Sequence, residues 1–350
     1  MHRFPTPDQV TDPAAIAAWL GAVRAVEREP LTTAGFSGAR FERLVVTLAS
    51  GEQRRYVAKR FRPREDWTAV RSGDIDGRAT AMLSEPRLAG IWDAFACPYV
   101  GFACDGGEVA LLMVDLTPHL FPDVREPLRE QEEARVLGAL ASLHARFWES
   151  PALELAWLAH AEHHAGLLDA RCAADPVCSA VFTDTLREMG TRGWAAALRL
   201  LPRSLDGLIR SPVHELSWLW RELPRTLVHG DAKVANFALL PDGRVAAFDW
   251  ALLGAGPATL DIGWYVAINA SRLTGTKEET LRRYRALLET ARGVALDDAC
   301  WDRLVRAGIV IAARMLLWSK ALAVEAGRTG AQAEWTWWVE RLEAVSAGAR

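Results

Sequence analysis

The chain contains few cysteines for its length, only five in 350 residues, and the number is odd. Their positions are scattered and match no metal-binding or redox motif. Cys172 and Cys178, for example, are separated by a spacing that neither kind of site uses. A disulfide scaffold is therefore excluded, and we expect reduced thiols and a cytoplasmic location.

Net charge and long apolar runs are also scarce. The formal net charge of −3 gives no electrostatic reason to bind nucleic acid or an anionic membrane surface. The first ten residues lack the apolar run of a signal peptide, and the longest uncharged apolar runs, such as 308–313, are too short to span a bilayer. Because 50% of the residues are hydrophobic and 24% are charged, we expect a soluble globular protein with a sizeable core.

The first 115 residues predict a small lobe built on an antiparallel sheet. Asp12 and Pro13 are typical of a helix start, and the helical pattern continues to residue 27. Residues 40–61 indicate two strands joined by a turn at Gly51. A helical pattern interrupted by Pro86 follows, and residues 99–116 predict a second hairpin. Helices and an antiparallel sheet together indicate the α+β class.

Residues 116–350 are predicted to be mostly helical. Val136, Leu140 and Leu143 recur at helical spacing, and Thr276 with Glu279 forms a capping-box pattern at the start of another helix. A short hairpin with the turn sequence PDGR interrupts the helices. We therefore expect a small sheet lobe followed by a large helical lobe that contains this hairpin.

The segment LVHGDAKVANFALLPDGRVAAFDW, residues 227–250, sets polar side chains among apolar strand residues. A hairpin brings Asn236 and Asp249 to its open end, where an amide oxygen and a carboxylate suit Mg²⁺. Asp231 would remain available to accept a hydroxyl proton. Lys59, on a predicted strand, can hold phosphate oxygens. These are the groups that phosphoryl transfer requires.

The motif HGDAKVAN, followed by FDW, resembles the aminoglycoside phosphotransferase and choline kinase-like family of small-molecule kinases. The resemblance covers nearly the whole chain and implies a protein-kinase-like bilobal fold, with a nucleotide-binding lobe over residues 1–115 and a helical lobe over 116–350. It implies ATP or GTP as donor with Mg²⁺. It also makes Asp231 the catalytic base, Asn236 and Asp249 the metal ligands, and His229 a structural member of the catalytic loop.

The same resemblance places residues around the nucleotide. Lys59 would hold phosphates and pair with a helix glutamate, for which Glu85, directly before Pro86, is the best candidate. Ser37 and Gly38, in AGFSGARF, are candidates for a phosphate loop whose amides approach the nucleotide. An ordinary β-turn is the alternative, and the position of the segment before two strands and Lys59 favours the phosphate loop.

Two further residues near the motif receive roles by resemblance. Asp261, in DIGW, would cap the following helix and accept hydrogen bonds from catalytic-loop amides. Lys233 departs from the family, whose members usually have histidine or another residue there. Lysine at this position is typical of protein kinases, in which it touches the transferring phosphate. An ammonium here can offset charge on the γ-phosphoryl group, and a solvated lysine is the alternative. Trp264, close by in sequence, could stack on a sugar or base.

We predict an NTP-dependent phosphotransferase that acts on a hydroxyl of a small molecule, either an antibiotic of aminoglycoside or nucleoside type or a sugar-containing metabolite. The stretch LHARFWESPALELAWL resembles the ecdysteroid-kinase-like branch, so a housekeeping kinase for a sugar, amino alcohol or steroid-like alcohol stays open. A nucleotide-binding pseudokinase is the alternative from a different class. The sequence indicates no nucleic-acid or membrane partner and leaves the oligomeric state open.

Overall fold

The computed structural model describes residues 1–32, 38–122, 124–172, 175 and 180–348. It divides into two compact units. The first, here the sheet unit, comprises Met1–Pro122 and Phe237–Ala251, and the second, the helical unit, comprises Asp123–Asn236 and Leu252–Arg350. The predicted α+β class is confirmed, because the large sheet lies in the first unit and the long helices in the second.

The sheet unit is built on six strands in the order β1-β5-β6-β4-β3-β2. The neighbouring strands are antiparallel except β1 and β5, which are parallel. The strands are β1 (His2–Arg3), β2 (Val23–Leu31), β3 (Arg40–Leu48), β4 (Gln53–Phe61), β5 (Tyr99–Asp105) and β6 (Glu108–Val114). The helices are η1 (Pro7–Val10), α1 (Pro13–Leu20), α2 (Trp67–Ser72), α3 (Arg78–Ser84), η2 (Pro86–Leu88), α4 (Ile91–Ala94) and η3 (Thr117–His119).

Both predicted hairpins of this sheet are present. Gly51, between β3 and β4, has φ of 85°, and Gly106 and Gly107, between β5 and β6, have φ of 59° and 78°. Glycine adopts these left-handed conformations without steric cost, so the turns form where the sequence indicates. The helix expected to reach residue 27 is shorter, because Gly21 ends α1 and the chain continues as β2 from Val23.

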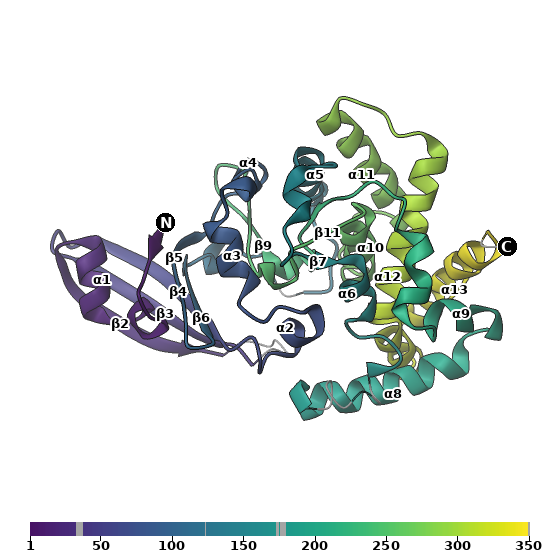
Figure 1. Cartoon of the computed structure of the whole chain (residues 1–350), viewed down its shortest axis with the longest axis horizontal. Coiled ribbons are helices and arrows are strands. Elements are labelled where there is room, and N and C mark those ends of the chain that lie inside the picture. The colour runs from purple at the N-terminus through teal and green to yellow at the C-terminus, as the bar shows by residue number, and fades with distance from the viewer. Residues whose placement is uncertain (33–37, 123, 173–174, 176–179, 349–350) are drawn as a thin grey trace. The chain divides into compact units, whose positions relative to one another are not determined.

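Helix α1 covers one end of the sheet (Figure 1). Ile16 of this helix packs with Leu44, Val46, Tyr56 and Leu112 of the strands in one buried cluster. Burial of these side chains stabilises the unit, at about 25 cal/mol per Å² of apolar surface removed from water. This packing holds β4, and with it Lys59, in place.

The second part of the sheet unit is the hairpin of β9 (Phe237–Leu239) and β10 (Val245–Ala247), paired from Leu239↔Val245 to Phe237↔Ala247. We expected this hairpin inside the helical lobe, but the structure groups it with the sheet unit. The Phe237 ring stacks on Phe95 with centroids 5.9 Å apart, and Ala238 and Ala246 are buried with Ala96. Because of these apolar contacts, the hairpin belongs to the sheet unit although it follows the helical segments in the sequence. The first continuous segment of the sheet unit extends to residue 122 instead of 115.

The helical unit contains the long helices and a small sheet. The helices are α5 (Glu130–Arg146), η4 (Pro151–Glu154), α6 (Ala161–Gly166), α8 (Asp184–Leu200), η6 (Arg203–Leu205), α9 (Asp206–Ile209), η7 (Val213–Leu219), η8 (Val234–Asn236), α10 (Thr259–Ile268), α11 (Lys277–Arg292), α12 (Asp298–Glu325) and α13 (Ala331–Ala347). The strands β7 (Ala159–His160), β11 (Gly254–Gly256) and β8 (Thr226–Val228) pair in that order. The predicted capping box of Thr276 and Glu279 is present at the start of α11.

Helix α12 forms the centre of the helical unit and packs against α8, α10 and α13 (Figure 1). Within the described residues it is the one helix long and apolar enough, by length and composition, to cross a membrane, and 72% of its most apolar window is buried. The buried guanidinium of Arg314 on this helix donates to Asp169 and to the carbonyls of Ala165, Leu208 and Ile209. The helix is therefore apolar because neighbouring helices surround it.

Candidate functional site

The loop that carries Asp231 begins where β8 ends. Gly230 has φ of 82°, and a Cβ at this position would lie 2.2 Å from the carbonyl oxygen of Leu252. No other residue fits, which explains the glycine of the HGD motif. The buried His229 accepts a hydrogen bond at Nδ1 from the Asp231 amide at 3.2 Å, in agreement with its predicted structural role.

Asp261 holds the backbone of this loop. Its carboxylate accepts hydrogen bonds from the amides of His229 and Gly230, both at 2.7 Å. Oδ2 also lies 3.0 Å from Nε2 of His144, whose Nδ1 is 2.5 Å from the hydroxyl of Tyr284. The predicted bonds from Asp261 to catalytic-loop amides are thus present, and His144 and Tyr284 extend the network into the core.

Helix α10 supports the same loop at both ends. The expected capping role of Asp261 is wrong, since the helix begins after Ala258 without a side-chain cap and the carboxylate is taken by the loop amides. At the other end, Asn269 accepts from the Val234 amide at 2.9 Å and donates to the Ala232 carbonyl at 3.2 Å. The loop is therefore fixed by both ends of one helix.

We expect Asp261→Asn to destabilise the fold in a pH-dependent way. Burial raises the pKa of Asp261, but the hydrogen bond and charge of His144, the charge of His229 and the Gly230 amide outweigh it, so this pKa lies below its ordinary value. A lowered folded pKa means that the ionised carboxylate stabilises the fold above the ordinary pKa of about 3.9, and that this stabilisation is lost as the pH falls toward the folded pKa.

Urea unfolding of Asp261→Asn should show a loss of about 3 kcal/mol in the free energy of unfolding at pH 7. The difference from wild type should stay constant to about pH 5 and shrink below about pH 4. Asp206→Asn, in an exposed ion pair of the same unit, is the control and should change the free energy by less than about 0.5 kcal/mol. A difference that is as large at pH 3 as at pH 7 would contradict the assignment of a lowered pKa.

The carboxylate of Asp231 is surrounded by donors in the helical unit. Oδ1 accepts the indole N–H of Trp264 at 2.8 Å. Oδ2 accepts from Nδ2 of Asn236 at 2.9 Å and lies 2.8 Å from Nζ of Lys233. The structure thus brings three of the sequence-predicted residues together, and it adds Trp264, which the sequence associates with stacking on a ligand. A carboxylate fixed in this way is suited to accept a proton from a defined direction.

In the sheet unit, Lys59 lies on β4 and pairs with Asp249, with Nζ 2.6 Å from Oδ1. The ammonium also lies 5.4 Å and 5.8 Å from the ring centroids of Phe61 and Phe41, which shield it from water. The amide of Asp249 donates to the Tyr99 hydroxyl at 3.3 Å, and its φ of 64° is in the left-handed region. Non-glycine residues adopt this conformation at a cost of about 1–3 kcal/mol, and such residues cluster at ligand sites.

Asp66 is a buried carboxylate near this pair that sequence analysis missed. It caps α2 by accepting the Ala69 amide at 3.0 Å. Burial raises the pKa of Asp66, the negative charge of Asp249 raises it further, and the positive charge of Lys59 opposes the increase. The sequence signal available was the pattern of an N-cap aspartate before a helix, which carries no information about proximity to Lys59.

The expected pairing of Lys59 with Glu85 is not found, because the two residues bind other partners. Pro86 ends α3 and holds Glu85 in an extended conformation. Its carboxylate accepts from the amide of Arg87 at 3.1 Å and from the Arg87 guanidinium at 2.9 and 3.0 Å. These hydrogen bonds lower the pKa of Glu85 to about 2. Glu85 therefore neutralises Arg87, and Asp249 neutralises Lys59.

The candidate phosphate loop is only partly within the described residues. Ser37 lies outside them. Gly38 is exposed just before β3, and a Cβ there would meet nothing within 4 Å. The fold itself therefore does not require glycine at position 38.

Asn236 in the helical unit and Asp249 in the sheet unit each carry an oxygen donor of the kind that magnesium prefers. The amide nitrogen of Asn236 donates to the Asp231 side chain and backbone carbonyl, so the amide oxygen is the atom with which Asn236 would bind a metal ion. Asp249 supplies a carboxylate. Across the described residues no group of three or more His, Cys, Asp or Glu residues is placed to hold a metal.

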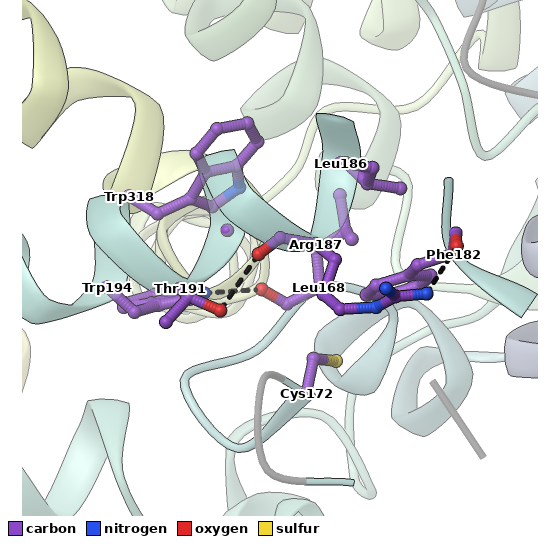
Figure 2. Close-up of a pocket in the computed structure, with 9 residues that line it drawn as sticks. Leu168, Cys172, Phe182, Leu186, Arg187, Thr191, Trp194 and Trp318 are labelled. Atoms are coloured by element: carbon purple, nitrogen blue, oxygen red, sulfur yellow. Dashed lines mark hydrogen bonds between the residues drawn. The ribbon is translucent and has the colours of Figure 1, made fainter. Parts of the chain in front are cut away.

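A small apolar pocket lies in the helical unit between α8 and α12 (Figure 2). Trp194 donates to the Leu168 carbonyl at its edge, and Thr191 donates to the Arg187 carbonyl. The space open to the centre of a water molecule is about 10 Å³, roughly that of one water. None of the predicted site residues lines it, so we regard it as a packing gap.

Comparison with known proteins gives one match to a family and many to solved structures. The sequence model of the phosphotransferase enzyme family matches residues 34–304. A search of curated proteins returns no match.

A choline kinase from Cryptosporidium parvum superimposes with a TM-score of 0.52 and 11% identity, over 97% of this chain and 95% of that one. Choline kinase LicA from Streptococcus pneumoniae gives 0.48 and 13%, over 96% and 97%. An aminoglycoside phosphotransferase from Alicyclobacillus acidocaldarius gives 0.47 and 16%, over 96% and 95%. At these identities the likeness concerns the fold, and the first structure supports the expected kinase-like fold.

Proposed function

Because this chain belongs to the phosphotransferase enzyme family and is a small-molecule kinase, we propose that it transfers the γ-phosphate of ATP or GTP to a hydroxyl group of an antibiotic or a sugar-containing metabolite. It would act in the cytoplasm on a soluble acceptor, without a nucleic-acid or membrane partner. The acceptor would be of aminoglycoside or nucleoside type, or a sugar derivative.

The observation that carries this proposal is the environment of Asp231. Its carboxylate lies at the end of a loop anchored by Asp261 and is held by Trp264, Asn236 and Lys233. A general base needs a fixed oxygen within hydrogen-bond reach of the proton that it removes. We assign Asp231 this role toward the acceptor hydroxyl, and Lys233 the role of offsetting charge on the transferring phosphoryl group.

The nucleotide phosphates are assigned to the sheet unit. Lys59 is a buried ammonium that already contacts a carboxylate oxygen, so phosphate oxygens are chemically suitable partners for it. Asn236 and Asp249 would hold Mg²⁺, which when bound neutralises phosphate charge and orients the nucleotide. The presence of Lys59, Asp231, Asn236 and Asp249 together argues against a pseudokinase, which has no need of all four.

The test is a screen for ADP or GDP release by the purified full-length chain. Mg-ATP and Mg-GTP would each be combined with a panel of aminoglycosides, nucleosides, sugars, amino alcohols and steroid-like alcohols. Release stimulated by an antibiotic or a sugar-containing compound, with a phosphorylated product in the mass spectrum, supports the proposal. Stimulation by an amino alcohol or steroid-like alcohol alone would favour a housekeeping kinase, and nucleotide binding without any turnover would favour the pseudokinase.

We expect Asp249→Ala and Asn236→Ala to weaken binding of the Mg²⁺-nucleotide, and Asp249→Ala to have the larger effect. A carboxylate neutralises part of the metal charge, whereas an amide only coordinates it. The loss should be at least about tenfold for Asp249→Ala, since changes in metal sites typically cost about 10–100-fold in affinity.

Calorimetric titration of ATP at several Mg²⁺ concentrations measures this effect. Asp242→Ala, in the exposed turn of the same hairpin, is the matched control and should bind as wild type does. Identical Mg²⁺ dependence of wild type and Asp249→Ala would remove Asp249 from the metal site.

A further inference from the structure

The two oxygens of Asp231 have different numbers of partners. Oδ2 accepts from Asn236 and contacts the ammonium of Lys233. Within the described residues, the hydrogen bond to Oδ1 comes from the indole N–H of Trp264 at 2.8 Å. A carboxylate offers about two lone-pair positions on each oxygen. The position left for a further donor is therefore on Oδ1, the atom that Trp264 holds.

Trp264 is well placed to fix this oxygen. Its side chain is buried, with the residue only 7% exposed, and it lies on α10 within one turn of Asp261. One helix therefore holds the loop backbone through Asp261 and the side chain of Asp231 through Trp264. The indole nitrogen is a donor only, so it stabilises an ionised carboxylate and does not compete for the proton.

We propose that Trp264 is a positioning residue that aims Oδ1 of Asp231 at the acceptor hydroxyl, an inference that rests on the proposed function. In the transfer step, Oδ1 takes the hydroxyl proton while the hydroxyl oxygen bonds to the γ-phosphorus. The bond from that phosphorus to the β,γ-bridging oxygen breaks, and the nucleoside diphosphate leaves with the electron pair. Without the indole N–H, the carboxylate rotates more freely and Oδ1 spends less time in the productive direction.

Trp264→Phe removes the N–H and keeps an aromatic ring. We expect it to lower kcat by about tenfold to a hundredfold, the range for a lost hydrogen bond to a charged group, while KM for the nucleotide changes less than threefold. The assay is ADP release from Mg-ATP with the acceptors of the panel and with water as acceptor.

A conservative variant separates positioning from packing. In Trp264→His the Nε2 atom takes the place of the indole nitrogen, although the smaller ring fills less of the site. If Trp264 positions Asp231, Trp264→His should retain a higher kcat than Trp264→Phe. If Trp264 acts only through packing, Trp264→Phe should retain the higher kcat. Trp318→Phe is the matched control, because Trp318 is equally buried in the same unit and donates to the Met315 carbonyl at 2.9 Å, away from the loop. It should keep kcat within about twofold.

A spectroscopic measurement tests the contact without turnover. In nitrogen-15 spectra of the indole groups, the resonance that disappears in Trp264→Phe identifies Trp264 among the fifteen tryptophans. We expect this resonance to shift in Asp231→Asn, because a neutral amide oxygen is a weaker acceptor than a carboxylate. It should be unchanged in Trp318→Phe.

The results separate the two proposals. If the wild type is active and Trp264→Phe keeps the wild-type kcat, the role of Trp264 is overturned and the kinase assignment stays intact. The same conclusion follows if the indole resonance of Trp264 does not shift in Asp231→Asn. A wild type that binds Mg-ATP but transfers phosphate neither to water nor to any acceptor would overturn the proposed function, and the positioning role with it. A lower kcat for Trp264→His than for Trp264→Phe would show that Trp264 acts through packing.

Discussion

Asp231→Asn should remove nearly all turnover while nucleotide affinity stays within a few-fold of wild type. Asparagine keeps the shape of the side chain and one acceptor oxygen for Trp264, but it cannot take a proton at neutral pH. General-base assistance is typically worth about 10²–10⁴-fold, so kcat should fall by about this factor. Affinity should be preserved because Asp231 is assigned to the acceptor and not to the nucleotide.

The measurement combines steady-state ADP release with calorimetric titration of Mg-ATP. Asp242→Asn is the matched control, since Asp242 pairs with Arg244 in the exposed hairpin turn, and it should keep kcat within about twofold. Turnover by Asp231→Asn near the wild-type rate would remove Asp231 from the base role. A large loss of nucleotide affinity would place Asp231 on the nucleotide instead.

Lys233→Met should lower kcat and kcat/KM for the nucleotide together by about 10²–10³-fold, with KM little changed. Methionine keeps the length and apolar bulk of the side chain and deletes the ammonium. An electrostatic contact made mainly in the transition state is worth about 2–4 kcal/mol, which corresponds to this fall. The Lys233 side chain is 36% exposed, so a lysine that is only solvated would change the rate less than about threefold.

Steady-state kinetics in which each substrate is varied separately distinguish the outcomes for Lys233. Arg210→Met, which deletes another half-exposed cation paired with an aspartate, is the control and should have no effect on kcat. A raised KM for the acceptor with normal kcat would place Lys233 on the acceptor.

Because Lys233 contacts Asp231 directly, the double variant Asp231→Asn/Lys233→Met should lose less than the product of the two single losses. Fully multiplicative losses would show that the two residues act independently.

The sequence alone was sufficient for the features that depend on neighbouring residues. Turn glycines located the hairpins of the sheet, and the capping-box pattern at Thr276 located the start of α11. Only the structure shows why Gly230 of the HGD motif is glycine, because the Leu252 carbonyl approaches it closely. Turn glycines and capping residues are informative in the sequence because their interactions involve only neighbouring residues. Local conformational preferences dominate such interactions.

The expected pairing of Glu85 with Lys59 is wrong for a local reason. Pro86 predicts that the helix ends beside Glu85, whereas the family resemblance names Glu85 as the partner of Lys59. The extended backbone at residue 85 brings its carboxylate to Arg87, two residues away. A strong local ion pair therefore prevailed over a pairing taken from the resemblance.

Only the tertiary structure decided which distant side chains meet. Trp264 reaches Asp231 across 33 positions of sequence, and Lys59 reaches Asp249 across 190. The partnership of His144 with Asp261 spans 117 positions. Such contacts depend on how helices and strands pack their buried faces, and periodicity identifies a buried face without identifying its partner. The sequence by itself therefore determined the chemical groups available to this protein, whereas packing determined which oxygen of Asp231 remains open.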